Sequence, residues 1–531
     1  MERREILKRL TVLPLAGSLL PLESLLGSPT GPLEAGPNIY QSIGVEPVIN
    51  CRGTFTIIGG SIERPRVRAA MEAASGFFVQ YDELAFGVGR RLAELTGAEY
   101  GMVSAGCAAG MKHVTAACVA GGNPEKLIRI PDLSGFEKNE VVIPARSRTV
   151  YDHAIRNIGV KIITVNSTEE LIKSLSPRTA MIYMMAGNVD LPKIAEAAKP
   201  LNIPILVDAA AEDLTVKPNV HLQQGATVVA YSGGKALCGP QCAGLLLGPK
   251  NLLMSAWQAS SPHHGPGRDN KVGKEEMLGM LAAVEDWVTR DHVEKMKTWN
   301  LWLDNISKRV SSLGGITCSV RQPVGIDNAS PRLTITWDVA TFNIDGQDLA
   351  EELAIKPPRI ALSGSAVDAT GKTTLSINAG QMQLGNDKIV GNRIVEVLSQ
   401  KRPPKSTEMA PASFNLTGRW DVDIEFYSSK SQHTFYIESQ DGNWIQGAHK
   451  GEYSTRELVG VLEGDQVKLS SAYRAAGDNV PFLFYGTATA DKMSGEIYLG
   501  EYIRAKFTAT KNVRKADHRT LRVPKGQPLS S

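Results

Sequence analysis

The chain has 531 residues, too many for one domain of ordinary size, so two to four domains are expected. Its 42% hydrophobic and 21% charged residues are typical of a globular protein and exclude a fibrous or disordered chain. A net charge of +3 gives no reason to expect nucleic acid as a partner. The six cysteines form no CxxC pair and no metal-ligand spacing, so neither a disulfide framework nor a metal site is expected.

The N-terminus begins MERREILK and continues into an apolar stretch over residues 10–26. This pattern resembles a twin-arginine export signal, which carries folded, often cofactor-containing proteins out of the cytoplasm. The apolar stretch is interrupted by two prolines and a glutamate, so a membrane span is not predicted. We expect residues 1–37 to form the signal and a linker, giving a periplasmic or exported protein. The alternative is a disordered basic tail.

A glycine-containing turn is the first candidate site. Residues 100–103 predict a strand, and a small-residue helix is expected to follow Gly106 and end near Gly122. The helix N-terminus directs free backbone N–H groups and a positive dipole end to one point, which suits a phosphate group. The candidate ligands are Gly106, Cys107 and Ala108, and the alternative is a tight turn without a ligand.

Three further apolar runs predict buried strands, near residues 180–185, 205–207 and 227–231. The segments between them are long enough for helices. This βαβ repetition predicts a mostly parallel sheet covered by helices on both faces.

An acid and a lysine follow two successive strands of this sheet. Asp208 ends the run 205–207, and the run 227–231 is followed by Ser232-Gly-Gly-Lys235. In such sheets the chemistry gathers at the carboxyl ends of the strands. Pyridoxal phosphate (PLP) uses this pair: a lysine forms a Schiff base with its aldehyde, and a carboxylate keeps its pyridine nitrogen protonated. Ser232 is a further candidate contact for the cofactor phosphate.

Each of these residues also has an ordinary interpretation. A strand-end aspartate is often a helix cap, and most lysines are solvated. The glycines before the lysine and the Gly-Pro-Gln after it (239–241) favour the cofactor, because they indicate a turn that approaches a ligand closely.

The segment YSGGKALCGPQCAGLLLG (231–248) resembles the Schiff-base segment of the bacterial selenocysteine synthase family, L-seryl-tRNA(Sec) selenium transferase, and of its D-glucosaminate-6-phosphate ammonia-lyase relatives. The segment GRDNKVGKEE (267–276) matches a second signature, and the resemblance covers roughly residues 45–400. It implies an α/β fold like that of aspartate aminotransferase, called PLP fold type I, and a homodimer or a higher homo-oligomer.

The resemblance implies further site residues. Asn50 would lie near the active-site mouth as a substrate contact, and His153 near the cofactor ring. Arg268 and Lys271 would bind a phosphate or substrate anion, with their loop crossing to the neighbouring site of the dimer. Arg359 would bind a substrate carboxylate. Asn50 as a strand end, His153 as a structural histidine and Arg359 as a surface residue are the alternatives.

The domain boundaries follow from composition. We expect a large PLP-binding domain over 38–313, a small αβ domain over 314–400 and a polar linker over 401–413. Alternating apolar and polar residues over 414–512 predict an antiparallel β-barrel or sandwich, followed by a tail over 513–531. This β-rich domain shows no catalytic pattern.

The expected function is that of a PLP-dependent lyase that acts by α,β-elimination on an amino acid or amino-sugar acid. Lys235 would move the proton at Cα, and Asp208 would keep the ring electron-poor. A selenium transferase is the first alternative, but residues 165–168 and 208–213 depart from that family's motifs, and the charge is weak for binding transfer RNA. A non-catalytic exported binding protein is the second.

Overall fold

The computed structural model describes residue 33, residues 35–404 and residues 409–513. These residues form two compact units, one that ends with residue 404 and one that begins with residue 409. The expected export signal and nearly all of the expected C-terminal tail lie outside the described residues. No helix within the described ranges is both long enough and apolar enough to cross a membrane.

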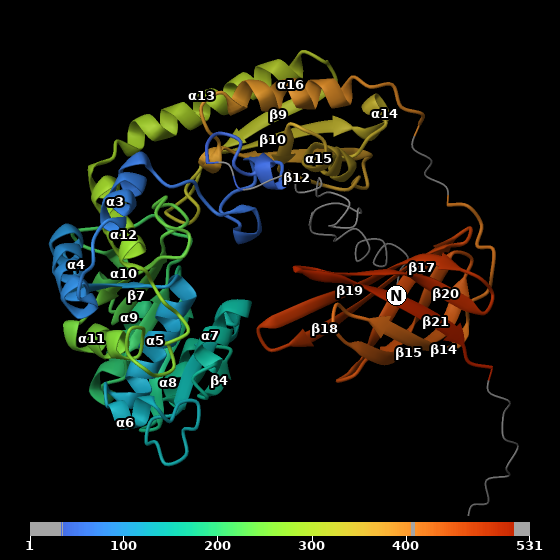
Figure 1. The fold of residues 1–531 in the computed structure, drawn as a ribbon. Helices are drawn as coiled ribbons and strands as arrows, with labels where there is room; N and C mark the ends of the chain where they lie inside the picture. Colours follow the sequence, from blue (N-terminus) through green and yellow to red (C-terminus); the bar gives the residue numbers. More distant parts are fainter. Residues whose placement is uncertain (1–32, 34, 405–408, 514–531) are drawn as a thin grey trace, which may run out of the picture. The chain divides into compact units, whose positions relative to one another are not determined.

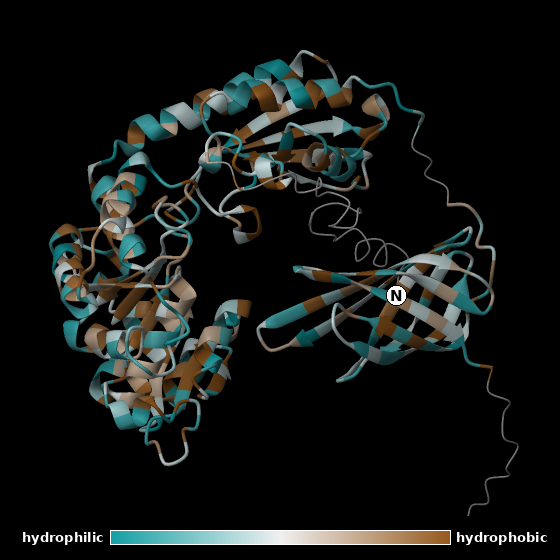
Figure 2. Ribbon diagram, in the orientation of Figure 1, coloured by the Kyte–Doolittle hydropathy of each residue, from teal (hydrophilic) through white to brown (hydrophobic). Residues whose placement is uncertain are grey.

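A seven-stranded sheet forms the centre of the large domain (Figure 1). Strands β3 to β7 are parallel to one another, whereas β8 is antiparallel to its two neighbours. The sheet is apolar and buried, as the predicted strands require, and Figure 2 shows hydrophobic segments at this centre. In spatial order the strands are β2 (Tyr100–Ser104), β8 (Gly244–Gly248), β7 (Val228–Ser232), β6 (Ile205–Asp208), β5 (Thr179–Met185), β3 (Glu140–Pro144) and β4 (Lys161–Val165).

Helices cover this sheet, and their ends carry the expected capping residues. The side chain of Ser167 accepts from Glu170 N–H at the start of α8, and Gly97 ends α4 in the left-handed conformation. Helix α5 is buried along most of its length and packs on β8 and α11. The helices are α3 (Pro65–Ser75), α4 (Tyr81–Thr96), α5 (Cys107–Ala120), α6 (Pro124–Leu127), α7 (His153–Arg156), α8 (Thr168–Ser174), α9 (Leu191–Ala198), α10 (Val220–Gln223), α11 (Lys250–Gln258) and α12 (Lys274–Thr289).

The small domain contains a four-stranded sheet in the order β12-β13-β10-β9. Its main strands are β10 (Arg332–Asp338) and β13 (Lys372–Asn378), and its last helix is α16 (Asn386–Leu398). Strand β1 (Val48–Asn50) pairs in parallel with β11 (Arg359–Ala361), so the N-terminal segment joins the small domain. The remaining elements are α13 (His292–Ser311), β9 (Ile316–Arg321), α14 (Val339–Phe342), α15 (Gly346–Ile355) and β12 (Ser363–Gly364).

The C-terminal unit is a closed barrel of eight antiparallel strands. Neighbours in sequence are neighbours in the barrel, and β21 closes it onto β14. Alternate residues point inward, as in β14, where Trp420, Val422 and Ile424 are buried. The strands are β14 (Gly418–Glu425), β15 (Lys430–Asp441), β16 (Trp444–Lys450), β17 (Thr455–Glu463), β18 (Gln466–Ala475), β19 (Asp478–Ala488), β20 (Lys492–Leu499) and β21 (Tyr502–Lys511). The expected fold class is confirmed, with a barrel rather than a sandwich.

Candidate active site

The carboxyl ends of four strands meet at one edge of the large sheet. Because β8 is antiparallel to both β2 and β7, β2 points in the same direction as β5, β6 and β7. The residues that end these four strands are Ser104, Met185, Asp208 and Ser232. The turn at Gly106 and the turn that carries Lys235 therefore follow strands of the same edge.

Asp208 is buried, with 7% of its surface exposed, and its carboxylate is held by three groups. The hydroxyl of Tyr183 donates to Oδ2 at 3.0 Å. The backbone N–H of Ala210 donates to Oδ1 at 3.1 Å, and the thiol of Cys107 lies 3.7 Å from the same oxygen. The strand end, the neighbouring strand β5 and the start of α5 thus converge on one carboxylate.

The charge on Asp208 depends on opposing effects. Burial raises the pKa of the Asp208 carboxyl above its ordinary value, whereas the Ala210 N–H, the Tyr183 hydroxyl and the Lys235 ammonium lower it. Burial, followed by the charge of Asp208, raises the pKa of the Cys107 thiol. Lys235 therefore lies close enough to Asp208 and Cys107 to influence the protonation of both.

The start of α5 has free backbone N–H groups and lies directly against the backbone of β8. Gly106 has φ +89°, and its side-chain-free position leaves the first N–H groups of the helix without a side-chain cap. On β8, a Cβ at Gly244 would lie 2.6 Å from the nitrogen of Cys107 and 2.5 Å from the carbonyl carbon of Gly106. Glycine at 244 therefore allows β8 to pack directly behind the turn formed by Gly106, Cys107 and Ala108.

Lys235 lines a cavity of about 700 Å³ to which both domains contribute. The large domain contributes residues that include Arg64, Asp213 and Arg290, and the small domain contributes Ser330 and Asn378. The cavity is thus a mixed polar space that opens beside the lysine.

A loop from the small domain also approaches Lys235. Residues Glu212 and Asp327 pair as an isolated β-bridge, and Asn328 N–H donates to Ala211 O at 3.0 Å. Burial raises the pKa of the Asp327 carboxyl, the charge of Glu212 adds to that effect, and Lys235 lowers the pKa. Asp327 is therefore a second acid within the electrostatic range of the lysine.

Two of the predicted site residues bond to backbone groups. The Asn50 side chain accepts from the N–H groups of Arg52 and Gly53 at 3.0 Å and donates to Gly53 O at 2.9 Å. The Arg359 guanidinium donates to Ala354 O at 2.7 Å and to Glu46 O at 3.2 Å. In this structure both side chains hold local backbone in place, and their substrate-binding roles stay predictions.

Ser232 and His153 are two further predicted contacts of the cofactor. Ser232 ends β7 and is half-buried, and His153 is exposed at the start of α7. The neighbouring Asp152 is fully buried between Arg148 and Arg156, and its charge acts on Tyr183. The turn before α7 is thereby fixed near the Tyr183–Asp208 pair.

Arg268 and Lys271 belong to a loop that packs over α5. Arg268 donates to Ser261 Oγ at 3.1 Å, and Lys271 is exposed. Lys112 of α5 anchors the loop through Asp269 at 2.9 Å and Asn270 at 3.1 Å. The loop is fixed to the helix whose first turn is the phosphate candidate, and its reach into a second subunit stays a prediction.

Tyr183 and Asp327 are not among the site residues predicted from the sequence. Tyr183 has a recognisable signal, because it is the one hydroxyl-bearing residue in the apolar run AMIYMM (180–185) of the strand before Asp208. Asp327 has no such signal, since it lies in a loop of the other domain and approaches Lys235 only in the folded chain.

Comparisons with known proteins agree with this geometry. The chain is 28% identical over 333 residues to D-glucosaminate-6-phosphate ammonia lyase of Salmonella typhimurium, covering 60% of this chain and 87% of the relative. It is 29% identical over 341 residues to 5'-C-glycyluridine monooxygenase-decarboxylase of a Streptomyces species, covering 61% and 83%. L-seryl-tRNA(Sec) selenium transferase of Moorella thermoacetica is 26% identical over 294 residues, covering 49% and 60%. No family model matches the chain.

The comparison with solved structures finds the same relative. A solved structure of D-glucosaminate-6-phosphate ammonia-lyase superposes with a TM-score of 0.61 at 26% identity, covering 68% of this chain and 98% of that one. The interpretation of the chain as an enzyme is confirmed by these relationships. The α/β part of the chain is therefore related in sequence and fold to D-glucosaminate-6-phosphate ammonia lyase, and in sequence to L-seryl-tRNA(Sec) selenium transferase, as the motif around Lys235 predicts.

Proposed function

We propose that the chain is a PLP-dependent lyase that eliminates a group from an amino acid or amino-sugar acid. The observation that carries this proposal is the convergence of Asp208, Lys235 and the start of α5 at one sheet edge, beside a cavity of about 700 Å³.

The residues fit PLP at each end of the cofactor. Asp208 is a buried carboxylate already fixed by Tyr183 and Ala210, which suits a pyridine nitrogen. The uncapped first turn of α5 suits the phosphate, with Ser232 at the end of the neighbouring strand β7. Lys235, which lines the cavity, is the residue for the aldehyde. When bound, PLP supplies an electron-accepting ring that stabilises negative charge at the substrate Cα.

The chain's own residues would complete the reaction. Asp208 would hold positive charge on the ring nitrogen, and Tyr183 would keep that carboxylate oriented. Lys235 would take the proton from Cα and return one to the product, because it lines the cavity that would hold the substrate. The group at Cβ would leave with its bonding electron pair, and the resulting enamine would tautomerise to an imine, which water hydrolyses to a keto acid and ammonia.

The relatives favour one first assay. The relative named as a D-glucosaminate-6-phosphate ammonia lyase is covered over 87% of its length, against 60% for the selenium transferase. An amino-sugar acid phosphate is therefore the first candidate substrate, and seryl-tRNA the second.

The decisive experiment is an absorbance spectrum of the purified full-length chain, followed by ammonia release from D-glucosaminate-6-phosphate and from a panel of amino acids. We expect a visible cofactor band that borohydride fixes to the protein. Lys235→Ala should lose both the band and the linkage, whereas the exposed Lys250→Ala should keep them. A Lys235→Ala protein that still shows a borohydride-reducible link would prove the lysine assignment wrong.

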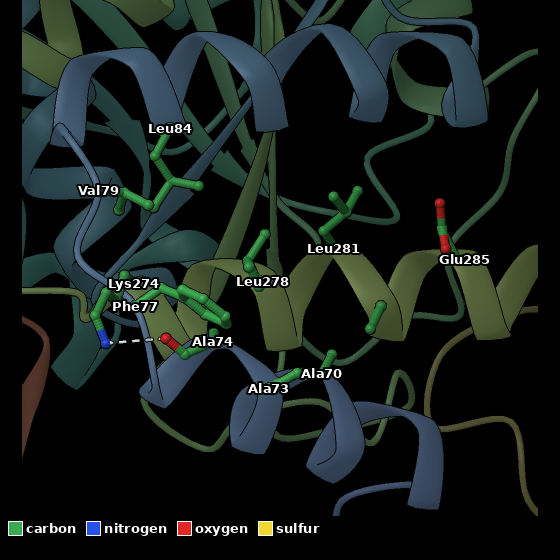
Figure 3. Close-up of a pocket in the computed structure, with 11 residues that line it drawn as sticks. Ala70, Ala73, Ala74, Phe77, Val79, Leu84, Lys274, Leu278, Leu281 and Glu285 are labelled. Atoms are coloured by element: carbon green, nitrogen blue, oxygen red, sulfur yellow. Dashed lines mark hydrogen bonds between the residues drawn. The ribbon is translucent and has the colours of Figure 1, made fainter.

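We further propose that the chain forms a homodimer through an apolar face next to α3 and α4. Phe77 and Phe78 lie in the turn between these helices, and Phe78 is fully exposed. Beside them is a groove of about 490 Å³ lined by Val79, Leu84 and other mainly apolar residues (Figure 3). A large exposed apolar patch of this kind marks an association surface.

We also propose export by the twin-arginine route. The support is the paired arginines and the apolar stretch that follows them in the sequence. Fractionation of expressing cells, with Arg3→Lys and Arg4→Lys combined, tests this. Export that persists in the double variant would refute it.

A further inference from the structure

Lys295 is a cation of the cavity that has no anionic partner among the described residues. Lys295 lies near the start of α13, and its ammonium is 5.1 Å from the ring centre of Trp287 and 4.6 Å from that of Trp299. Within the described ranges its side chain makes no ion pair or hydrogen bond. Two neighbours differ, because Arg290 pairs with Asp286 at 2.7 Å and Lys297 pairs with Glu294 at 3.5 Å.

The surroundings of Lys295 disfavour its charge. Burial lowers the pKa of the Lys295 ammonium, and the charges of Arg290 and Arg64 lower it further, whereas Asp213 raises it. Asp213 lines the same cavity, and burial raises the pKa of its carboxyl. The two groups are not within ion-pair distance of each other, so neither charge is neutralised by direct contact.

Lys295 is half-buried. An unpaired ammonium in such a place loses part of its hydration without gaining a partner, and an anion that enters the cavity compensates for that loss. The position is accessible to a ligand, because Lys295, Trp299 and Lys235 line one cavity. The two indole rings fix the direction of the ammonium through cation–π contacts. An anion at this point would therefore meet a preoriented donor.

We propose that Lys295 is the anion-binding residue of this cavity and takes the second charged group of the substrate, a phosphate or a carboxylate, whose amine lies at Lys235. This subsite rests on the proposed function, because it assigns a place to a group of the same substrate. Asp213 opposes the anion by charge repulsion and so limits its affinity.

The small domain supplies neutral donors to the same space. Asn378 and Gln381 line the cavity, and the Asn378 carbonyl oxygen is already occupied by Gly380 N–H at 2.7 Å and Ser330 Oγ at 3.0 Å. The amide nitrogen of Asn378 is thereby directed as a donor. A ligand that spans from Lys235 to Lys295 can carry hydroxyl groups against this side.

The test is a titration of the purified full-length protein, loaded with cofactor, with inorganic phosphate and, separately, with acetate. Tryptophan fluorescence reports binding, since Trp287 and Trp299 contact the ammonium, and calorimetry measures the affinity. We expect saturable phosphate binding that Lys295→Met weakens by about tenfold or more. Lys297→Met is the matched control and should bind as the parent does. Asp213→Asn should bind several-fold more tightly.

The two probes show whether the substrate group bound at Lys295 is a phosphate or a carboxylate. Saturation by phosphate alone indicates that the subsite takes a phosphate ester. Saturation by both probes indicates that it accepts a phosphate or a carboxylate. Equal phosphate affinity in the parent and Lys295→Met, or no saturation by either probe, overturns the subsite. The comparison does not depend on turnover: failure to release ammonia from any substrate tested counts against the proposed lyase, while the difference between Lys295→Met and Lys297→Met still decides the subsite.

Discussion

The hydroxyl of Tyr183 donates a 3.0 Å hydrogen bond to Oδ2 of Asp208, across the two adjacent strands β5 and β6. Both groups are buried, so water cannot replace this donor if it is removed. Tyr183 therefore supports the charged form of the carboxylate on which cofactor binding is proposed to depend.

Tyr183→Phe should weaken retention of PLP. Loss of a hydrogen bond to a charged group costs about 1.5–3 kcal/mol, which corresponds to a weakening of roughly tenfold or more. Equilibrium dialysis followed by absorbance measures the retained cofactor. Tyr231→Phe is the matched control, since it removes a buried hydroxyl that bonds to Asn219 at 2.8 Å and leaves Asp208 untouched. Equal losses in both variants would show that the Tyr183 contact has no special role.

Gly244→Ala should disrupt the turn at the start of α5. The new Cβ would lie 2.5–2.6 Å from backbone atoms of Gly106 and Cys107, and backbone cannot rotate away as a side chain can. We expect loss of cofactor binding and a lower free energy of unfolding. Gly87→Ala in α4 is the control, because nothing lies within 4 Å of its Cβ position. That change should stabilise the helix by about 0.5–1 kcal/mol. Normal cofactor content in Gly244→Ala would contradict the assigned turn.

The barrel should lose stability in mild acid. His433 and His449 share a 2.8 Å hydrogen bond in its interior, and His449 is 3.0 Å from Ser471 Oγ. Burial, with a further contribution from Arg456, lowers the pKa of His433 to about 4 and that of His449 to about 2. Below an unfolded pKa of about 6.5 the unfolded chain takes up protons that the folded barrel excludes, so stability present at neutral pH falls as the pH falls.

Each histidine should cost about 2 kcal/mol between pH values of about 7 and 5. Amide hydrogen exchange of β15 and β16 is the suitable measurement, because His113 in the α/β unit also has a lowered pKa and would affect a global unfolding signal. His449→Gln should reduce the pH dependence by about one histidine's share. An unchanged dependence in that variant would exclude His449 as its source.

Phe78→Asp should convert the proposed dimer to a monomer. The side chain is fully exposed in the described chain, so its replacement does not disturb the core, whereas a charge at an apolar interface is strongly unfavourable. Light scattering after size exclusion measures the mass. Tyr427→Asp is the control, because Tyr427 is also largely exposed but belongs to the barrel unit. A parent protein that is already monomeric would refute the proposed dimer.

The sequence by itself predicts the mostly parallel sheet, an antiparallel β-rich C-terminal domain, and the two strand ends of the sheet that are followed by the candidate residues. Apolar runs, alternating patterns and glycine turns are local features, so the strands that end at Asp208 and Ser232 are recognisable without a fold. Because strands joined by helices run in parallel, placing Asp208 and Lys235 at one edge follows from the same pattern.

Only the tertiary structure decides which side chains meet there. The strand order β2-β8-β7-β6-β5 places Tyr183 and Cys107 against Asp208, although they are 25 and 101 residues away in the chain. The folded small domain also brings Asp327 to Lys235. Packing between distant segments determines these contacts, and local sequence patterns do not encode it.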